Sequence, residues 1–201
     1  MVNSIELYGK IEAVLVFSVL LISGCIEGQT EQSFSDVIDT DKYTLYENKG
    51  VRFYYPNSAT ITGTTIGLEQ TLAVFHLNRG NINVQKFELP VDAGYGEFTD
   101  EDCQAFVNDI VDQFQLTYGV QTVNVISARS DMLGEMSACK FTYEATMENK
   151  KLGFTQYTTL QGTNGYQVTY TETLDDGIDV SATYADVVDL GILVSTFEVT
   201  N

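Results

Sequence analysis

Residues 99–119 read TDEDCQAFVNDIVDQFQLTYG and carry the clearest helical pattern in the chain. Thr99 can cap the first turn, with Asp102 three residues later as the second half of a capping box. Gly119 is a suitable stop for such a helix. Apolar residues follow the i, i+3, i+4, i+7 spacing of one helical face. The stretch therefore predicts an amphipathic helix that packs on another layer through Cys103, Phe106, Val107, Ile110, Val111 and Phe114.

The residues after this helix predict a sheet as the other layer. Residues 120–133 and 135–151 indicate two consecutive strands, and the second alternates apolar and polar residues with a period of two. Residues 152–174 predict a further pair of strands around a turn at Gly162–Gly165. In residues 135–151, the apolar face comprises Cys139, Phe141, Tyr143, Ala145 and Met147, and the polar face comprises Lys140, Thr142, Glu144 and Thr146.

The two ends of the domain complete the fold class. A hairpin over residues 43–56 and three more strands precede the helix, and residues 181–199 predict a final helix despite Gly191. Its apolar positions at helical spacing are Tyr184, Val187, Val188 and Ile192. A parallel α/β sheet would need a helix between most strands. We therefore expect an α+β domain, a central antiparallel sheet covered by the amphipathic helix and the C-terminal helix.

The N-terminus is typical of an exported protein. Residues 13–24, AVLVFSVLLISG, are uncharged. They are too few for the roughly 20 residues of a spanning helix but fit the roughly 7–15 of a signal-peptide core. Ile22-Ser23-Gly24-Cys25 then resembles the lipobox of prokaryotic lipoproteins. The resemblance implies cleavage before Cys25 and a diacylglyceryl group on its thiol, a stable two-chain anchor. The alternative is an uncleaved membrane-associated segment with Cys25 as an ordinary thiol.

These patterns predict the domain organisation. We expect a signal peptide over residues 1–24, an acidic tether over residues 25–42 and a single α+β domain over residues 43–201. The mature protein would be anchored by lipid at the extracytoplasmic face of the cell membrane.

The chain is strongly acidic, with 28 Asp plus Glu against 10 Lys plus Arg and a formal charge of −18. Such a surface repels phosphate backbones, and the sequence holds no basic cluster that would offset the repulsion. We therefore expect no nucleic-acid partner. The acidity is typical of solubility and self-repulsion, and an acidic docking site for a cationic partner is the alternative.

Cys103 and Cys139 remain when Cys25 is set aside, and an even number suits an oxidising compartment. They lie on the apolar face of the predicted helix and on the apolar face of a predicted strand. If the helix covers that face of the sheet, the two thiols could form a disulfide worth about 3–4 kcal/mol in the loop-entropy model. Two separately buried thiols are the alternative.

The order of elements resembles a known family. A strand with Gly50-Val51-Arg52-Phe53 and Tyr55-Pro56 opens the domain, and a helix with Ile192-Leu193, followed by Ser195 and Phe197, closes it. These motifs and the elements between them resemble the Mog1/PsbP-like α/β/α sandwich over about residues 43–200. The resemblance implies a binding or assembly role and brings no catalytic residues with it.

The sequence contains few candidate catalytic or metal-binding residues. His76 is the single histidine, and we expect it to be a solvent-facing or hydrogen-bonded strand residue. Gly94-Tyr95-Gly96 lacks the third glycine of a dinucleotide loop. Asp175, Asp176 and Asp179 could gather Ca²⁺, but their spacing is not that of an EF-hand and better suits a solvated turn. We expect no metal and no cofactor.

The sequence therefore favours a membrane-anchored, extracytoplasmic lipoprotein with a non-catalytic binding or assembly role. An unknown protein or small ligand would be held against the tyrosine-rich sheet, because Tyr combines apolar area with a hydrogen-bonding tip. The alternative is a secreted carboxylate-dependent hydrolase. A deep cleft with two acids of raised pKa would favour that enzyme, and an open aromatic patch would favour the binding protein.

Overall fold

The computed structural model describes residues 38–62, 71–77, 79–89, 92, 94, 96–118, 122–147, 150–174 and 184–200. Its elements, in chain order, are β1 (Tyr43–Asn48), β2 (Val51–Pro56), β3 (Thr60–Thr62), β4 (Thr71–His76), β5 (Gly80–Glu88), α1 (Asp100–Tyr118), β6 (Thr122–Leu133), β7 (Met136–Met147), β8 (Lys150–Gln161), β9 (Asn164–Leu174), α2 (Tyr184–Ser195) and β10 (Glu198–Val199). The lipobox and Asp175, Asp176 and Asp179 lie outside the described residues.

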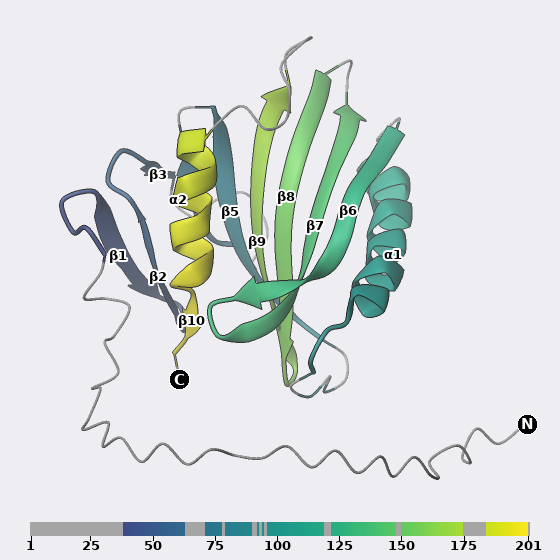
Figure 1. Ribbon diagram of the computed structural model, residues 1–201, viewed down its shortest axis with the longest axis horizontal. Coiled ribbons are helices and arrows are strands. Elements are labelled where there is room, and N and C mark those ends of the chain that lie inside the picture. Colours follow the sequence, from purple (N-terminus) through teal and green to yellow (C-terminus); the bar gives the residue numbers. More distant parts are fainter. Residues whose placement is uncertain are drawn as a thin grey trace, which may run out of the picture. The chain divides into compact units, whose positions relative to one another are not determined.

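The described strands form two sheets. Seven strands make an antiparallel sheet in the order β3-β4-β5-β9-β8-β7-β6, and β1, β2 and β10 make a smaller antiparallel one. Helices α1 and α2 pack on opposite faces of the large sheet, and the small sheet lies on the α2 side (Figure 1). The predicted α+β fold, a central antiparallel sheet covered by two helices, is confirmed.

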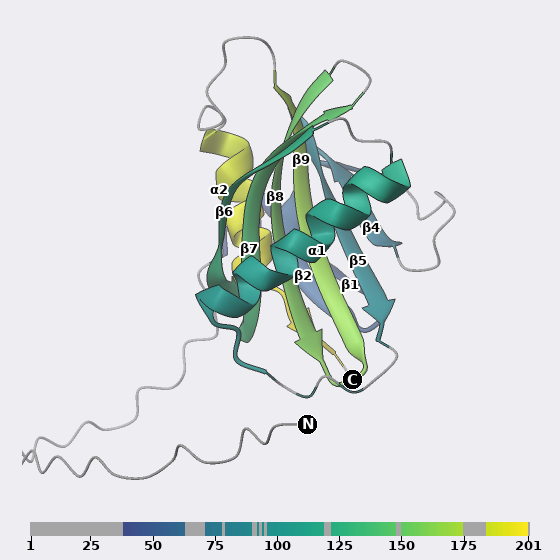
Figure 2. The same cartoon turned by 90° about the vertical axis from the view of Figure 1, so that its right-hand side faces the viewer.

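The α1 face has its own apolar core. Cys103 and Val107 of α1 are fully buried against the strand residues that the period-2 pattern predicted, Cys139, Phe141, Tyr143 and Ala145. Figure 2 shows α1 running obliquely across the strands of this face.

The capping box of α1 is formed as predicted. The Asp102 backbone N–H donates to Thr99 Oγ1 at 3.2 Å, and the Thr99 N–H donates to Asp102 Oδ2 at 3.0 Å. Two of the N–H groups that a helix start leaves unpaired are thereby satisfied.

Cys103 and Cys139 form a disulfide that joins α1 to β7. Both residues are fully buried, because each lies on the apolar face of its element. The sequence had left this pairing open beside two separate thiols. A covalent link therefore holds the α1 layer on the sheet.

The α2 face has a second core, built around Phe53 of β2. The Phe53 ring stacks on Tyr46 at 4.8 Å and on Phe197 at 5.8 Å between centroids, and meets the edge of Phe75 at 5.7 Å. These aromatic contacts join the small sheet, the end of the chain and the large sheet. Alternate residues of β9, Tyr166, Val168 and Tyr170, are also buried here, as the alternation predicted.

The final helix differs from the prediction in its buried face. Val187 and Val188 are exposed, and the residues of α2 turned toward the core are Asp186, Leu190, Leu193 and Val194. Asp186 can occupy this face because its carboxylate accepts hydrogen bonds from Tyr170 Oη at 3.1 Å and from the Arg79 backbone N–H at 3.2 Å. A buried carboxylate with two partners is tolerated where an unpaired one is not.

The final helix is also shorter than predicted. It ends at Ser195, and Thr196 Oγ1 donates to the Ile192 carbonyl at 2.7 Å. The chain then forms β10, whose Val199 is opposite Val51 in β2. The sequence analysis missed this two-residue strand because so short a run carries no periodic signal. No helix within the described ranges is long and apolar enough to cross a membrane.

Removing the disulfide should destabilise the domain by about 3–4 kcal/mol, because the unfolded chain regains the entropy of an open loop. The measurement is urea unfolding of the wild type and of the Cys103→Ala, Cys139→Ala double variant. In excess reductant, the wild type should have the same urea midpoint of unfolding as the double variant. Equal midpoints for oxidised wild type and double variant would contradict a stabilising link.

Candidate functional site

The described surface has a hollow at the end of the sheet and another beside α2. The first, here named the hairpin pocket, has a volume of about 580 Å³. The second, here named the α2 groove, has a volume of about 630 Å³. Both fall within the range of small-molecule sites, roughly 300–1,000 Å³. The hairpin pocket is lined by residues 96–98, 130–132, 135–137 and 159–161. The α2 groove is lined by Ile126, Lys140, Thr142, Gly153, Phe154, Thr155, Tyr157, Tyr170, Glu172, Val187, Leu190 and Gly191.

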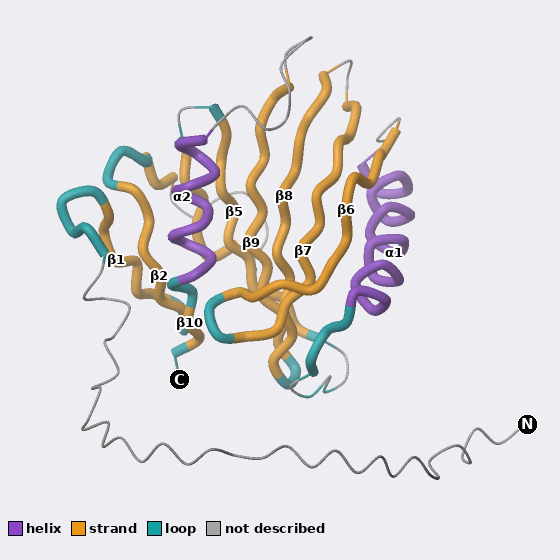
Figure 3. The backbone as a smooth tube through the Cα atoms, viewed as in Figure 1, coloured by secondary structure: helices purple, strands orange, loops and turns teal. Residues whose placement is uncertain are grey.

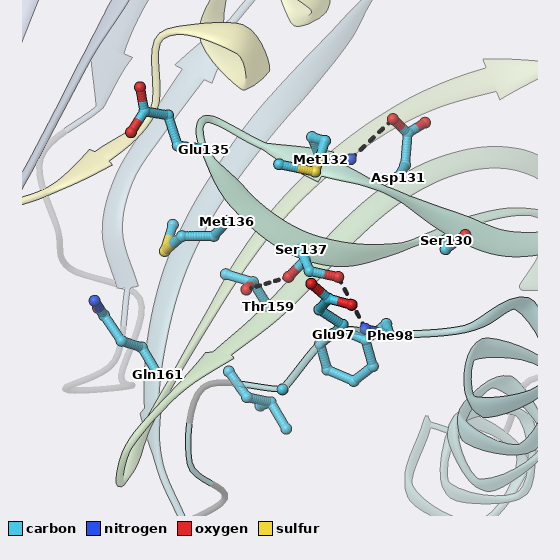
Figure 4. A pocket seen from close by; sticks show the side chains of 12 residues that line it. Glu97, Phe98, Ser130, Asp131, Met132, Glu135, Met136, Ser137, Thr159 and Gln161 are labelled. Carbon is cyan, nitrogen blue, oxygen red and sulfur yellow. Dashed lines mark hydrogen bonds between the residues drawn. The ribbon is translucent and has the colours of Figure 1, made fainter. Parts of the chain in front are cut away.

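The hairpin pocket is held together by hydrogen bonds around Ser137. The Phe98 backbone N–H donates to Ser137 Oγ at 2.8 Å, and Thr159 Oγ1 donates to the Ser137 carbonyl at 2.7 Å. These bonds fix the segment before α1 and the end of β8 to the start of β7 (Figure 4). The shape of the pocket is therefore fixed by hydrogen bonds between three segments of the chain.

The carboxylates of the hairpin pocket do not converge. Figure 4 shows the side chains of Glu97, Asp131 and Glu135 pointing in different directions. Asp131 is also within 3.7 Å of both Arg129 and Lys140. Among the described residues, no group of three or more His, Cys, Asp or Glu side chains is placed to hold a metal ion. This geometry offers neither a paired acid and base nor a metal site.

The floor of the α2 groove is the sheet between α2 and strand β6. Thr142 of β7 is opposite Thr155 of β8, which is opposite Tyr170 of β9. Two residues along the strands, on the same face, Lys140 is opposite Tyr157. The floor therefore combines two aromatic rings with threonine hydroxyls and one ammonium group.

The wall of the groove is α2, and contacts at both ends fix that helix. Near its start, Asp186 accepts the Tyr170 hydroxyl described above. At its end, the Gly134 N–H in the β6–β7 turn donates to the Val194 carbonyl at 2.7 Å. Gly134 has φ +61°, and an added Cβ would lie 1.8 Å from the Phe197 carbonyl oxygen, so only glycine fits. Figure 3 shows the β6–β7 hairpin curling toward this end of α2.

Gly191 leaves the wall open. It lies inside α2, where glycine costs roughly 1 kcal/mol relative to alanine. A Cβ built at Gly191 meets no atom within 4 Å apart from its own helix and chain neighbours, so close packing does not require glycine here. The missing side chain therefore enlarges the groove.

Lys140 is the basic group of the groove. Its side chain is 23% exposed, and its ammonium lies 4.9 Å from the centre of the Tyr157 ring and 3.7 Å from the Asp131 carboxylate. The first contact is a cation–π interaction. The second is longer than a hydrogen bond. The ammonium is thus held in the groove by attraction without close hydrogen bonding to Asp131.

Two acids of α2 are close to each other but lie outside both hollows. Asp186 is buried, and Asp189 accepts a hydrogen bond from Tyr43 Oη at 3.0 Å. Burial raises the pKa of the Asp189 carboxyl, the Tyr43 hydrogen bond opposes this rise, and the Asp186 charge adds to it. Neither acid lines the hairpin pocket or the α2 groove. They fasten the helix to its neighbours.

The structure places most of the other predicted residues away from the two hollows. Cys103 and Cys139 lie beneath α1, and His76 is exposed at the end of β4. The tyrosines of the sheet are buried, not spread over an open patch, and only Tyr157 and Tyr170 reach a hollow. Cys25 lies outside the described residues.

The sequence analysis missed the residues of the α2 groove. Lys140 and Thr142 were assigned to the polar face of a strand, and the periodic pattern could not show that a helix rims that face. Gly191 was the available signal, since a glycine inside an otherwise regular helix suggests close packing or a functional reason.

Comparison with solved structures shows a PsbP-like fold. The solution structure of cyanobacterial PsbP (CyanoP) from Synechocystis sp. PCC 6803 is similar with a TM-score of 0.54 and 15% identity, over 81% of this chain and 95% of that one. A Bacteroides thetaiotaomicron VPI-5482 protein has a TM-score of 0.49 and 13% identity, over 80% of this chain and 48% of that one. The PA94 protein of unknown function from Pseudomonas aeruginosa has a TM-score of 0.36 and 13% identity, over 66% and 83%.

The identities are low, so the likeness concerns the fold alone. No family model matches the chain, and no curated protein matches its sequence. The predicted Mog1/PsbP-like architecture is thus supported by structure and not by sequence family.

Replacing Asp189 with Asn should stabilise the protein at pH 7 relative to the wild type, and not at pH 3. Because the folded-state pKa of Asp189 is raised above 3.8, the wild type loses stability as the pH rises from about 4 through that pKa. Urea unfolding at both pH values measures the difference.

Asp100→Asn is the matched control with the opposite sign. Hydrogen bonds from the Ser130 N–H and Ser130 Oγ lower the pKa of the Asp100 carboxyl. This variant should therefore be less stable than the wild type at pH 7. The difference should vanish at a pH below both the folded-state and the unfolded-state pKa of Asp100. The same pH trend in both variants would contradict the burial of Asp189.

Gly191→Ala should stabilise the domain by about 0.5–1 kcal/mol, because alanine restricts the unfolded chain and meets no obstruction in the groove. Urea unfolding measures this change. Gly134→Ala, at the obstructed turn, should instead be strongly destabilising. A loss of stability in Gly191→Ala would show that the helix needs glycine at this position.

Proposed function

We propose that this protein is an extracytoplasmic lipoprotein that binds its ligand in the α2 groove and performs no catalysis. The observation that carries the proposal is the groove itself. It is an apolar, aromatic hollow with a few polar groups at defined positions, and this is the usual composition of a ligand site. It lies between elements that are fixed at both ends of α2, so the site is preformed.

The disulfide supports a location outside the cytoplasm. Cytosolic thiols are kept reduced in most organisms, and stable disulfides are typical of exported proteins. The Cys103–Cys139 link is buried between two layers, where it serves the fold. The lipobox-like motif ending at Cys25 supports a lipid anchor from an independent part of the chain.

The non-catalytic part of the proposal is supported by the arrangement of the acids. In the described hollows, the carboxylates of the hairpin pocket diverge, and Glu172 is the single carboxylate lining the α2 groove. Glycoside hydrolysis needs two carboxyl groups facing each other across a substrate. No specific observation favours the carboxylate-dependent hydrolase.

The first test is the intact mass of the protein from the membrane fraction of its host, measured without reductant. We expect the mass of residues 25–201 plus a diacylglyceryl group, and a rise of about two daltons on reduction of the disulfide. Cys25→Ala should accumulate unprocessed and without lipid.

The control is Cys103→Ala, Cys139→Ala, which should still be processed and lipidated, because the signal lies at the N-terminus. An unlipidated, full-length mass for the wild type would contradict the proposed location. The groove could then still bind a ligand, and that part of the proposal would be tested separately.

A further inference from the structure

We propose that the α2 groove binds a single-chain amphiphile with one anionic head group, such as a fatty acid. The head group would lie at the Lys140 ammonium, and the hydrocarbon chain would lie along α2. This inference deepens the proposed binding function and rests on it.

The apolar side of the groove suits a hydrocarbon chain. Val187 and Ile126 are each 51% exposed at the rim, and Leu190 with the Tyr157 and Tyr170 rings completes the apolar lining. The two exposed side chains stand on different elements, Val187 on α2 and Ile126 on β6, and both line the same hollow. Burying a chain against them would gain roughly 0.8 kcal/mol per methylene group.

Ile126 lies at the rim of the groove, at an irregularity in β6. The register of β6 and β7 shifts between Val125 and Ser127, which leaves Ile126 as the extra residue of a β-bulge. Bulges often redirect a side chain next to a functional site. Because Val125 packs on the α1 side of the sheet, the alternation of the strand already turns Ile126 toward the groove face.

Lys140 selects the charge of the ligand. The chain has 10 basic residues against 28 acidic ones, yet one of them is placed half-enclosed among the aromatic rings of this groove. Its ammonium has three donors, and its contact with Asp131 at 3.7 Å is beyond hydrogen-bond distance. A carboxylate or similar anion would gain charge-assisted hydrogen bonds there. The Thr142 hydroxyl on the same strand offers a further donor.

Glu172 places a carboxylate at the other end of the groove, where its Oε2 accepts a hydrogen bond from Tyr170 Oη at 3.4 Å. Glu172 lines the groove from β9 and is opposite Gly153 of β8. Lys140 is opposite Tyr157, which lies four residues further along β8. A second anion at the far end of the ligand would therefore approach a carboxylate. A monoanionic amphiphile satisfies both ends of the groove, and a dianionic one does not.

The experiment measures binding of four ten-carbon probes by isothermal titration calorimetry with the full domain. They are decanoate, decanol, decylammonium and decanedioate. We expect decanoate to bind most tightly, because it is the one probe that combines an apolar chain with a single anion. Equal binding of decanoate and decylammonium would overturn the role of Lys140, and no binding of any probe would overturn the proposal.

Variants identify the site. Lys140→Met should weaken decanoate binding about tenfold, the equivalent of one charge-assisted contact, and leave decanol unchanged. Lys151→Met is the matched control, since Lys151 pairs with Glu144 at 2.7 Å and does not line the groove. Gly191→Leu, which fills the open wall, should weaken every probe at least tenfold.

A second matched pair tests the rim of the groove. Val187 and Val188 are neighbours on α2 and both are exposed, but only Val187 lines the groove. Val187→Gln should weaken decanoate and decanol, and Val188→Gln should weaken neither. Equal effects in the two variants would place the binding elsewhere.

Two further measurements complete the test. One asks whether the amphiphile comes from a bilayer, and the other distinguishes a failure of this inference from a failure of the proposed location. Flotation of the domain without the proposed Cys25 anchor, with vesicles of anionic phospholipid, shows whether the groove takes the amphiphile from a bilayer. Vesicle binding that survives Gly191→Leu would contradict the groove as the site. A lipidated protein whose groove binds no probe would disprove this inference alone, because the mass measurement stands independently of it.

Discussion

The stacking of Phe53 between Tyr46 and Phe197 is the contact on which the second layer depends. It joins the N-terminal hairpin to the segment that follows α2, and the edge contact with Phe75 fixes both to the large sheet. Because the end of α2 is held there, the helix lies over the β5 and β9 side of the sheet, and a groove remains beside it over parts of β7 and β8. The α2 groove is the consequence of this position.

The two faces of the sheet are closed in different ways. On one face, a buried disulfide holds α1 over β7. On the other, α2 is held by polar contacts at its two ends and by apolar packing between them. The covalent link allows a stable domain even though the opposite face keeps an open groove. A binding site can therefore exist here without weakening the fold that carries it.

The charge of the chain shapes how such a site would work. A formal charge of −18 repels anions at long range, so the apolar contacts must supply much of the affinity of an anionic amphiphile. Lys140 acts locally, where the low dielectric around the Tyr157 ring strengthens its attraction. Asp131, which lines the hairpin pocket and lies 3.7 Å from Lys140, keeps this ammonium in place.

The sequence by itself determined the elements of this protein. The apolar stripe and the capping box of residues 99–119 predicted α1, and the alternation in residues 135–151 predicted the buried face of β7. These signals are local, since each arises from residues a few positions apart. The tertiary structure alone decided which face of α2 is buried. Asp186 lies in the core because Tyr170 and the Arg79 backbone, 16 and 107 residues away, donate hydrogen bonds to it. The α2 groove depends on which face of α2 is buried. That choice is made by contacts between distant segments, and the local periodicity of the sequence cannot predict it.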